Sequence, residues 1–363
     1  MECYPIVFVH GFNNMGETFA PAATYLNGLG YEAYAPHIAP FTSAWDRACD
    51  LYAMLFGGTA DYGKAHSKKG RHKRYGLHYD GILPDLGQPG AHEKVNLVGH
   101  SFGGETIRVL LHLLAYGDEK ERAVTKEEDL SPLFLGGQEQ LINCIYCLAS
   151  PLNGTTLCTD LDRMTRLLSF GQLKKANQLS GSGDPYAAVM LMDQFGFTSA
   201  EKKHIYKPLS ILRFLFSKDS CYGDLSLQGA AKWNAILDTV DSVYYFSQPA
   251  DISAKKGLLT VPAEGVLDRY KISVSFMGLV HARQGKAWAA SDGRVNTISE
   301  TAPFDEPQVD YTDSMTLQKG IWHVMPTQPV NHTFYEGEEV PTEKFEAFYR
   351  ELGALLERIS GTE

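Results

Sequence analysis

The apolar residues of this 363-residue chain fall into short runs, separated by longer segments with helical periodicity. The runs predict strands at residues 5–11, 31–37, 94–100, 141–150, 241–248 and 320–326. Segments of helical length, such as FAPAATYLNGLG and TIRVLLHLLAYG, lie between several of these runs. Strands that are apolar throughout and alternate with helices are typical of a parallel sheet covered by helices on both faces. The pattern therefore predicts an α/β fold.

The pattern changes between residues 155 and 234, where strand-like runs give way to amphipathic segments such as DRMTRLLSF and YKPLSILRFLF. We expect a helical insertion, or lid, over one end of the sheet, with SGSGD as a hinge within it. The chain then divides into a first core part at 1–154, the lid at 155–234 and a second core part at 235–363. Five apolar lid residues either cover a site or pack in an ordinary core: Met190, Met192, Phe214, Leu215 and Phe216.

A glycine-flanked serine follows one of the predicted strands. The segment Gly99-His100-Ser101-Phe102-Gly103 satisfies G-x-S-x-G, with VNLVG before it and the helical segment GGETIRVLLHLL after it. A tight turn here would push the Ser101 hydroxyl out of the carboxyl edge of the sheet. The glycines would remove side chains that collide where strand and helix cross. Ser101 is therefore predicted to be a nucleophile, the alternative being a chance match in an ordinary turn.

A nucleophilic serine needs a base, an acid that orients the base, and donors for an oxyanion. His332, in PVNHTFYEG, follows the last predicted strand and fits the chain order Ser, Asp, His, whereas its rival His323 lies inside that strand. Asp292, in the turn-prone AASDGRVNT, is the candidate acid. Spacing alone leaves four other aspartates open: Asp268, Asp305, Asp310 and Asp313. The backbone N–H groups of Phe12 and Phe102 are the candidate oxyanion donors.

Charge and hydropathy narrow the classes of partner. The chain has 33 basic and 43 acidic residues, a formal net charge of −10, so its surface as a whole would repel nucleic acids and anionic membranes. No apolar run reaches the roughly 18 residues that a membrane-spanning helix needs. Because the first residues lead directly into a predicted strand, we expect either a protein made without a signal peptide or a mature form that has lost it.

The six cysteines are dilute in a chain of this length, and we expect mostly free thiols. Cys144 and Cys147 lie inside the apolar run LINCIYCLAS. A buried strand explains this pair better than a redox or zinc motif does.

The segment KAHSKKGRHKRYGLH, at residues 64–78, is crowded with Lys, Arg and His and allows three interpretations. Its charge suggests a patch for nucleic acid or heparin, but the acidic chain around it argues against this. A solvated loop is the ordinary interpretation. In the third, His66 and His72 are metal ligands, although a separation of six residues is not diagnostic.

Nine motifs occur in an order that is specific to one family: PIVFVHGF, SAWDRACDLYAMLFGGTADYG, LVGHSFGGETIR, DLSPLFLGG, ASPLNGTTL, YGDLSLQGAAKWN, SDGRVNT, LQKGIWHVM and VNHTF. The chain resembles the thermoalkalophilic, zinc-containing family I.5 lipases of bacteria and their polyester-hydrolysing relatives. The resemblance implies the α/β-hydrolase fold, a triad of Ser101, Asp292 and His332, and oxyanion donors at Phe12 and Phe102.

The same resemblance implies a zinc ion. The family's ligand positions match four residues here: Asp46, His66, His72 and Asp224. Four protein ligands leave no open coordination position, so the zinc would be structural and would tie the lid to the core. The calcium site of the family is expected to be absent, because Phe334 and Glu339-Val340 stand where acidic ligands and an Asp-Pro would be needed.

The function that we expect is serine ester hydrolysis through an acyl-enzyme, on acylglycerols or other hydrophobic esters, including polyesters. The substrate would be met at a lipid–water or polymer–water interface, and the protein would be an extracellular monomer with neither a nucleic-acid partner nor an integral membrane segment. Two alternatives stay open. In one the four-ligand metal site is catalytic, and in the other the protein is a non-catalytic binding module with this fold.

Overall fold

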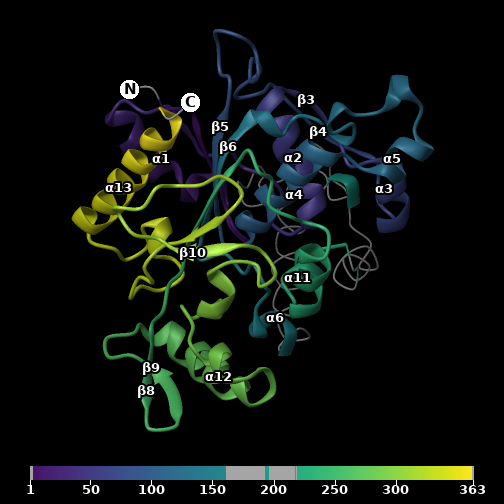
Figure 1. Ribbon diagram of the computed structural model, residues 1–363. Coiled ribbons are helices and arrows are strands. Elements are labelled where there is room, and N and C mark those ends of the chain that lie inside the picture. Colours follow the sequence, from purple (N-terminus) through teal and green to yellow (C-terminus); the bar gives the residue numbers. More distant parts are fainter. Residues whose placement is uncertain (1–2, 161–192, 196–216, 218, 362–363) are drawn as a thin grey trace, which may run out of the picture.

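The structure is a computed structural model that describes residues 3–160, 193–195, 217 and 219–361. Its centre is a seven-stranded sheet in the order β10-β11-β7-β6-β5-β1-β2, and every neighbouring pair is parallel (Figure 1). The strands are β1 (Ile6–Val9), β2 (Ala33–Tyr34), β5 (Val95–His100), β6 (Ile142–Leu148), β7 (Tyr244–Gln248), β10 (Gln308–Asp310) and β11 (Trp322–Val324). Each of the six predicted strands contains one of these strands. The predicted α/β class is therefore confirmed.

Two layers of helices cover the sheet. The α-helices are α1 (Ala20–Gly28), α2 (Ala44–Phe56), α3 (Lys64–Gly70), α4 (Phe102–Tyr116), α5 (Glu119–Val124), α6 (Thr156–Asp160), α10 (Cys221–Asp224), α11 (Leu227–Asn234), α12 (Asp268–Gln284) and α13 (Thr342–Ser360). Helices α1 and α13 pack together on one face of the sheet, and α2 and α4 pack together on the other.

The central strand β1 shows why two faces are needed. Its side chains alternate between two buried clusters: Ile6 and Phe8 join the cluster with α1 and α13, and Val7 and Val9 join the cluster with α2 and α4. Successive side chains of a strand point to opposite faces. Burying each such side chain is worth about 1.5–3 kcal/mol relative to exposure. A run that is apolar at every position therefore requires cover on both sides.

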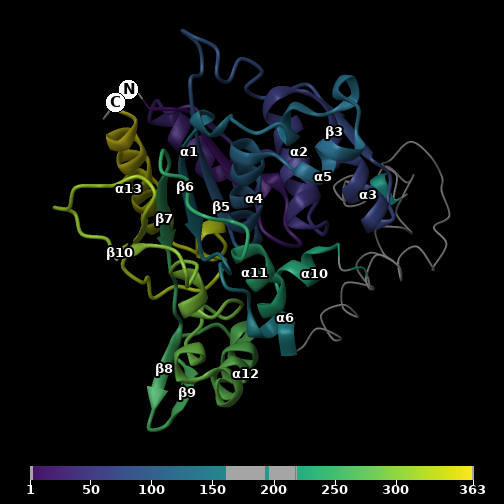
Figure 2. The same cartoon turned by 45° about the vertical axis from the view of Figure 1, so that its right-hand side comes forward.

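Two hairpins lie outside the main sheet. Strands β3 (Gly58–Asp61) and β4 (Tyr75–Tyr79) flank α3, and β8 (Ser253–Lys256) pairs with β9 (Leu259–Pro262) beside α12. Both views show the β8–β9 hairpin and α12 extending away from the sheet (Figures 1 and 2). The 3-10 helices are η1 (Gly16–Thr18), η2 (Glu127–Asp129), η3 (Pro132–Phe134), η4 (Glu139–Leu141), η5 (Asp193–Phe195), η6 (Lys286–Ala289), η7 (Thr297–Glu300) and η8 (Phe334–Glu336).

The described part of the predicted lid contains α6, η5, α10 and α11 and no strand. The SGSGD hinge and the five apolar lid residues, Met190, Met192, Phe214, Leu215 and Phe216, lie outside the described residues. The division of the chain at 154 and 234 stays a prediction. None of the six cysteines forms a disulfide, and Cys144 and Cys147 are buried in β6, as predicted. Among the helices that the structure describes, none is long and apolar enough to cross a membrane.

Candidate active site and metal site

Ser101 stands between β5 and α4 in a strained backbone conformation, with φ 53° and ψ −126°. A side chain on Gly99 would place its Cβ 2.5 Å from the backbone of Gly103, and one on Gly103 would collide with the carbonyl of Val9. A non-glycine residue in such a conformation costs about 1–3 kcal/mol, which persists only where the surrounding structure enforces it. The glycines of the motif therefore serve the close crossing of strand and helix that the sequence predicted.

The loop after β1 passes beside Ser101. A Cβ on Gly11 would lie 2.8 Å from Ser101 Cβ, so only glycine allows this close approach, and Phe12 is the next residue of the loop. In the described part of the chain, neither the Phe12 nor the Phe102 backbone N–H donates to a backbone carbonyl. Two free donors beside a serine hydroxyl are what an oxyanion needs.

Arg47, on α2, fixes this loop. Its buried guanidinium donates to the carbonyl oxygens of His10 and Ala39 and to the hydroxyl of Thr106 on α4. These bonds join the loop after β1, α4 and α2 in one network. Asp46, the neighbour of Arg47, belongs to the metal site described below.

His332 and Asp292 form a buried pair. His332 Nδ1 lies 2.5 Å from Asp292 Oδ2, and the other carboxylate oxygen accepts from the backbone N–H groups of Arg294 (2.8 Å) and Val295 (2.7 Å). The His332 backbone N–H also donates to the Asp292 carbonyl, at 3.1 Å. With its Nδ1–H held by the carboxylate, the imidazole presents Nε2 as a base.

The imidazole of His332 packs against the neighbour of the nucleophile. The rings of His100 and His332 are 4.7 Å apart, and His100 Nε2 donates to the His332 carbonyl at 3.0 Å. In the described residues the Ser101 hydroxyl makes no hydrogen bond to His332. Catalytic hydrogen bonds of this kind often tighten only when substrate is bound.

The rival histidine is occupied elsewhere. His323 lies in β11, where its Nδ1 donates to the Tyr245 carbonyl at 3.0 Å and its Nε2 accepts from the Gln318 backbone N–H at 3.3 Å. The other candidate acids, Asp268, Asp305, Asp310 and Asp313, have exposed side chains. The structure thus brings His332 and Asp292 together and leaves their rivals apart from them.

Burial shifts the pKa values of this pair and of a third carboxyl. Burial lowers the pKa of His332 below its ordinary 6.5, although Asp292 opposes this effect. Burial would raise the pKa of Asp292, but His332 and the backbone donors lower it. Burial raises the pKa of Glu300 well above its usual range, and the negative charge of Asp292 adds to this increase. The sequence analysis did not single out Glu300, whose raised pKa favours its neutral form beside Asp292.

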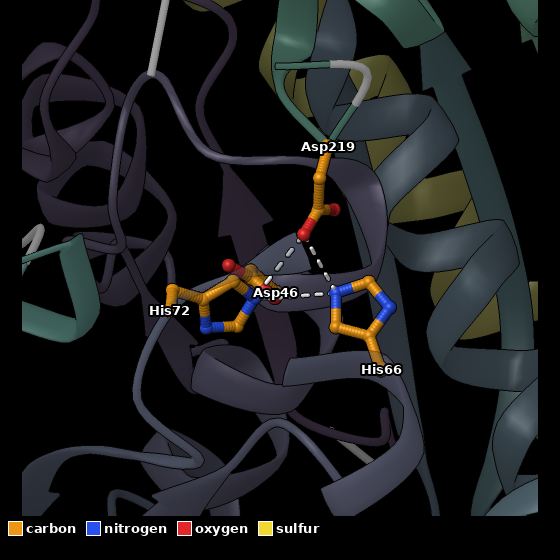
Figure 3. A group of neighbouring side chains, drawn as sticks. All are labelled: Asp46, His66, His72 and Asp219. Carbon is orange, nitrogen blue, oxygen red and sulfur yellow. Dashed lines mark hydrogen bonds and ion pairs between the residues drawn. The ribbon is translucent and has the colours of Figure 1, made fainter. Parts of the chain in front are cut away.

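Four side chains converge at a second site (Figure 3): Asp46 from α2, His66 from α3, His72 after α3, and Asp219 before α10. His66 Nε2 lies 3.0 Å from Asp46 Oδ1 and 3.2 Å from Asp219 Oδ2. His72 Nε2 lies 3.7 Å and 3.1 Å from the same two oxygens. A tetrahedral ion with bonds of about 2.0–2.1 Å separates its ligands by about 3.3–3.4 Å. The group can therefore hold a metal ion.

Neighbouring groups orient these ligands. His72 Nδ1 donates to the Lys73 carbonyl at 2.8 Å, and Gln194 Nε2 donates to Asp46 Oδ2 at 3.1 Å. Trp45 stacks on the His66 ring with centroids 4.9 Å apart. Hydrogen bonds to the second polar atom of a ligand, such as those to His72 Nδ1 and Asp46 Oδ2, are typical of metal sites in proteins. Although burial lowers the pKa of His66, its bonds to Asp219 and Asp46 raise the pKa to about 10. The two carboxylates of this group therefore stabilise a positive charge placed between them.

The predicted fourth ligand, Asp224, does not join this group, and Asp219 takes its place. The Asp224 carboxylate accepts from the Ala44 backbone N–H at 2.8 Å and from Trp233 Nε1 at 2.9 Å. Burial raises the pKa of Asp224 to about 7. The two aspartates are five positions apart and lie at opposite ends of α10, and sequence alone carried no signal to choose between them.

Comparisons with known proteins show what the chain as a whole is similar to. A family model described as the lipase-like C-terminal domain matches residues 2–352. The lipase of Staphylococcus hyicus is 32% identical over 387 residues, which cover 99% of this chain and 58% of that relative. Other curated relatives are covered over about half of their length, so the chain spans little more than half of the curated proteins it matches.

Two solved structures are similar over nearly the whole chain. The crystal structure of Staphylococcus hyicus lipase has a TM-score of 0.87 and 30% identity, over 99% of this chain and 97% of that one. The structure of EstA from Clostridium botulinum has a TM-score of 0.81 and 31% identity, over 98% of this chain and 88% of that one. At this identity and coverage the likeness extends beyond the arrangement of the sheet.

Proposed function

The chain belongs to the lipase-like C-terminal domain family of bacterial lipases, and on that premise we propose that it is a serine carboxylic-ester hydrolase. Its fold is the α/β-hydrolase fold, as predicted. The observation that carries the proposal is the buried His332–Asp292 pair beside the strained turn of Ser101. Its substrates are hydrophobic esters.

In this mechanism His332 Nε2 removes the proton of the Ser101 hydroxyl as the oxygen attacks the ester carbonyl. Asp292 holds the imidazole in one tautomer and stabilises the imidazolium that forms. The Phe12 and Phe102 backbone N–H groups bind the oxyanion, and each such donor is worth about 3 kcal/mol. His332 then returns the proton to the leaving alcohol. Water repeats the sequence on the acyl-enzyme and releases the carboxylic acid.

An active-serine phosphonate tests this proposal. A fluorophosphonate should label the folded protein once per chain, and peptide mapping should place the label on Ser101. Activity against soluble esters should fall in step with labelling. Labelling of any other residue, or full activity in the labelled protein, would remove the basis of the proposal. A non-catalytic binding module would leave Ser101 unlabelled.

We place the protein near the zinc-containing family I.5 enzymes and their polyester-hydrolysing relatives, on the motifs and the four-ligand group. An acylglycerol, another hydrophobic ester or a polyester each fit the proposed chemistry. The extracellular location, the monomeric state and the absence of the family's calcium site stay predictions.

The metal that we propose for the second site is zinc, held by Asp46, His66, His72 and Asp219. Two imidazoles and two carboxylates are a donor set that zinc accepts, and four protein ligands make the ion structural. When bound, it would join α2 and α3 to the segment that enters α10. A catalytic zinc, the alternative, would need an open coordination position, which the four convergent side chains do not leave.

Replacing Asp219 with alanine should lower zinc affinity by about 100-fold or more, because it removes a direct ligand and leaves a weaker three-ligand site. The matched control is Asp224→Asn, five positions away and half-buried but outside the group. It should lower the free energy of unfolding by about 1–3 kcal/mol and leave the zinc content at one ion per chain. Metal analysis after dialysis against a zinc buffer measures the zinc content of both variants. Loss of zinc in Asp224→Asn with retention in Asp219→Ala would reverse the assignment.

A further inference from the structure

The β8–β9 hairpin and α12, residues 253–284, form a unit that exposes apolar side chains. The three most exposed large apolar side chains among the described residues are all here: Leu258 (92%), Ile272 (82%) and Leu279 (62%). Leu259 adds a fourth, at 52%. Single exposed apolar residues are ordinary, but a concentration of them in one projecting unit marks an interaction surface.

Local geometry enforces this exposure. Lys256 pairs with Leu259 across the hairpin, so Gly257 and Leu258 form a two-residue turn, and Gly257 has φ +64°. Glycine at the first turn position is typical of a tight hairpin turn, which leaves the second residue at the tip. On α12, Ile272 and Leu279 are seven residues apart and therefore share one face, while Val274 is buried on another.

The charge of the unit is opposite to that of the chain. Residues 253–284 contain five Lys or Arg and two Asp or Glu, whereas the whole chain has a formal net charge of −10. Two of the basic residues are paired, Arg269 with Glu338 and Lys271 with Asp268. Lys255 and Lys256 are exposed on the hairpin next to Leu258. Apolar side chains flanked by lysines suit a surface that is both hydrophobic and anionic.

The unit is bonded to the loops that carry the proposed catalytic pair. The Ile252 backbone N–H, at the base of the hairpin, donates to the Ser291 carbonyl at 2.9 Å, one residue before Asp292. On α12, the hydroxyl of Tyr270 is 2.9 Å from that of Thr333, the neighbour of His332. A Cβ on Gly293 would lie 2.6 Å from the Tyr270 ring, so this ring packs directly on the aspartate loop. The base of the unit is therefore fixed to the loops of the proposed active site.

We propose that residues 253–284 dock the protein onto a lipid–water interface that carries anionic headgroups, with Leu258 inserted and Lys255 and Lys256 against the headgroups. This inference rests on the proposed ester hydrolysis for its purpose, because docking would present the site to esters in the lipid phase. It does not rest on hydrolysis for its test. The rest of the acidic surface would be repelled by such an interface, so the unit also sets the orientation of the bound protein.

The test is co-sedimentation of the full chain with vesicles of equal parts phosphatidylcholine and phosphatidylglycerol, in a Ser101→Ala background that cannot consume lipid. Leu258→Ser should raise the lipid concentration for half-binding about tenfold or more. Lys255→Gln with Lys256→Gln should raise it about 30-fold on these vesicles, since each lysine is worth about 1 kcal/mol near an anionic surface. On vesicles of phosphatidylcholine alone the lysine pair should have little effect.

The matched control is Leu135→Ser, a leucine that is 54% exposed at a distant position. It should bind as the Ser101→Ala parent does, and thermal unfolding should show all the variants to be folded. Equal binding by the Leu258→Ser variant and its parent, or an equal loss in Leu135→Ser, would overturn the docking surface. Because the parent is already inactive, a failure of the proposed hydrolysis would appear only in the labelling experiment and would leave this result unaffected.

Discussion

Replacing Ser101 with alanine is expected to lower kcat for ester hydrolysis by about 10⁴- to 10⁶-fold, with little change in KM. The hydroxyl is the proposed nucleophile, and its removal leaves only the oxyanion donors and substrate binding to assist direct attack by water. Steady-state hydrolysis of a soluble chromogenic ester measures the loss. The turn itself should survive, because the glycine contacts of Gly99 and Gly103 do not involve the hydroxyl.

Ser150→Ala is the matched control. This serine lies just past the end of β6, the strand next to β5, and its buried hydroxyl donates to the Gly99 carbonyl at 3.2 Å. The same hydroxyl also lies 3.2 Å from the Leu148 carbonyl, so its loss removes one donor shared by two carbonyls. A lost hydrogen bond is worth about 0.5–1.5 kcal/mol, and kcat should fall less than about tenfold. If Ser101→Ala kept substantial activity that a zinc chelator abolished, the metal site would be the catalytic one.

Replacing Asp292 with asparagine is expected to lower kcat by about 10⁴-fold, because the imidazole of His332 loses the partner that fixes its tautomer and stabilises its protonated form. The pH profile should move as well. His332 must be neutral to act as a base, so kcat/KM in the wild type should fall as pH drops through a pKa below 6.5, which burial lowers. Asp292 opposes that lowering, so its loss should shift the acid limb to still lower pH.

Asp310→Asn is the control for this prediction. Asp310 was among the aspartates that spacing left open, and it is exposed in the edge strand β10. Its activity and pH profile should match those of the wild type. An unchanged pH profile in Asp292→Asn, together with a shifted profile in Asp310→Asn, would show that the proposed assignment of the acid to Asp292 is wrong.

Much of the fold followed from local patterns. The six apolar runs contained strands because an unbroken run must be buried on both faces, as the alternation along β1 shows. Strand β10 escaped prediction because its three residues are exposed and leave no apolar signal at the sheet edge. The β8–β9 hairpin escaped for a related reason, since its tip carries apolar residues that face solvent and the pattern is therefore ambiguous.

The residues of the candidate sites also fall into those that sequence analysis could find and those that it could not. Ser101 was accessible to sequence analysis because its turn imposes a local glycine pattern, and His332 because chain order restricted the choices. His66 and His72 were chosen as metal ligands only through the resemblance to the lipase family, since their spacing alone was not diagnostic. Glu300 and the anchoring residue Tyr270 were missed, because their roles consist only of contacts with residues distant in the chain.

The sequence by itself determined the α/β class and the glycine-flanked turn at Ser101, because backbone sterics and hydrophobic periodicity act between near neighbours. Only the tertiary structure decided that Asp219 rather than Asp224 joins the two histidines of the metal site, that His332 meets Asp292, and that residues 253–284 project beside them. These choices depend on where distant segments of the chain are brought together by burial of their common core, and the spacing of residues along the chain carries no record of that.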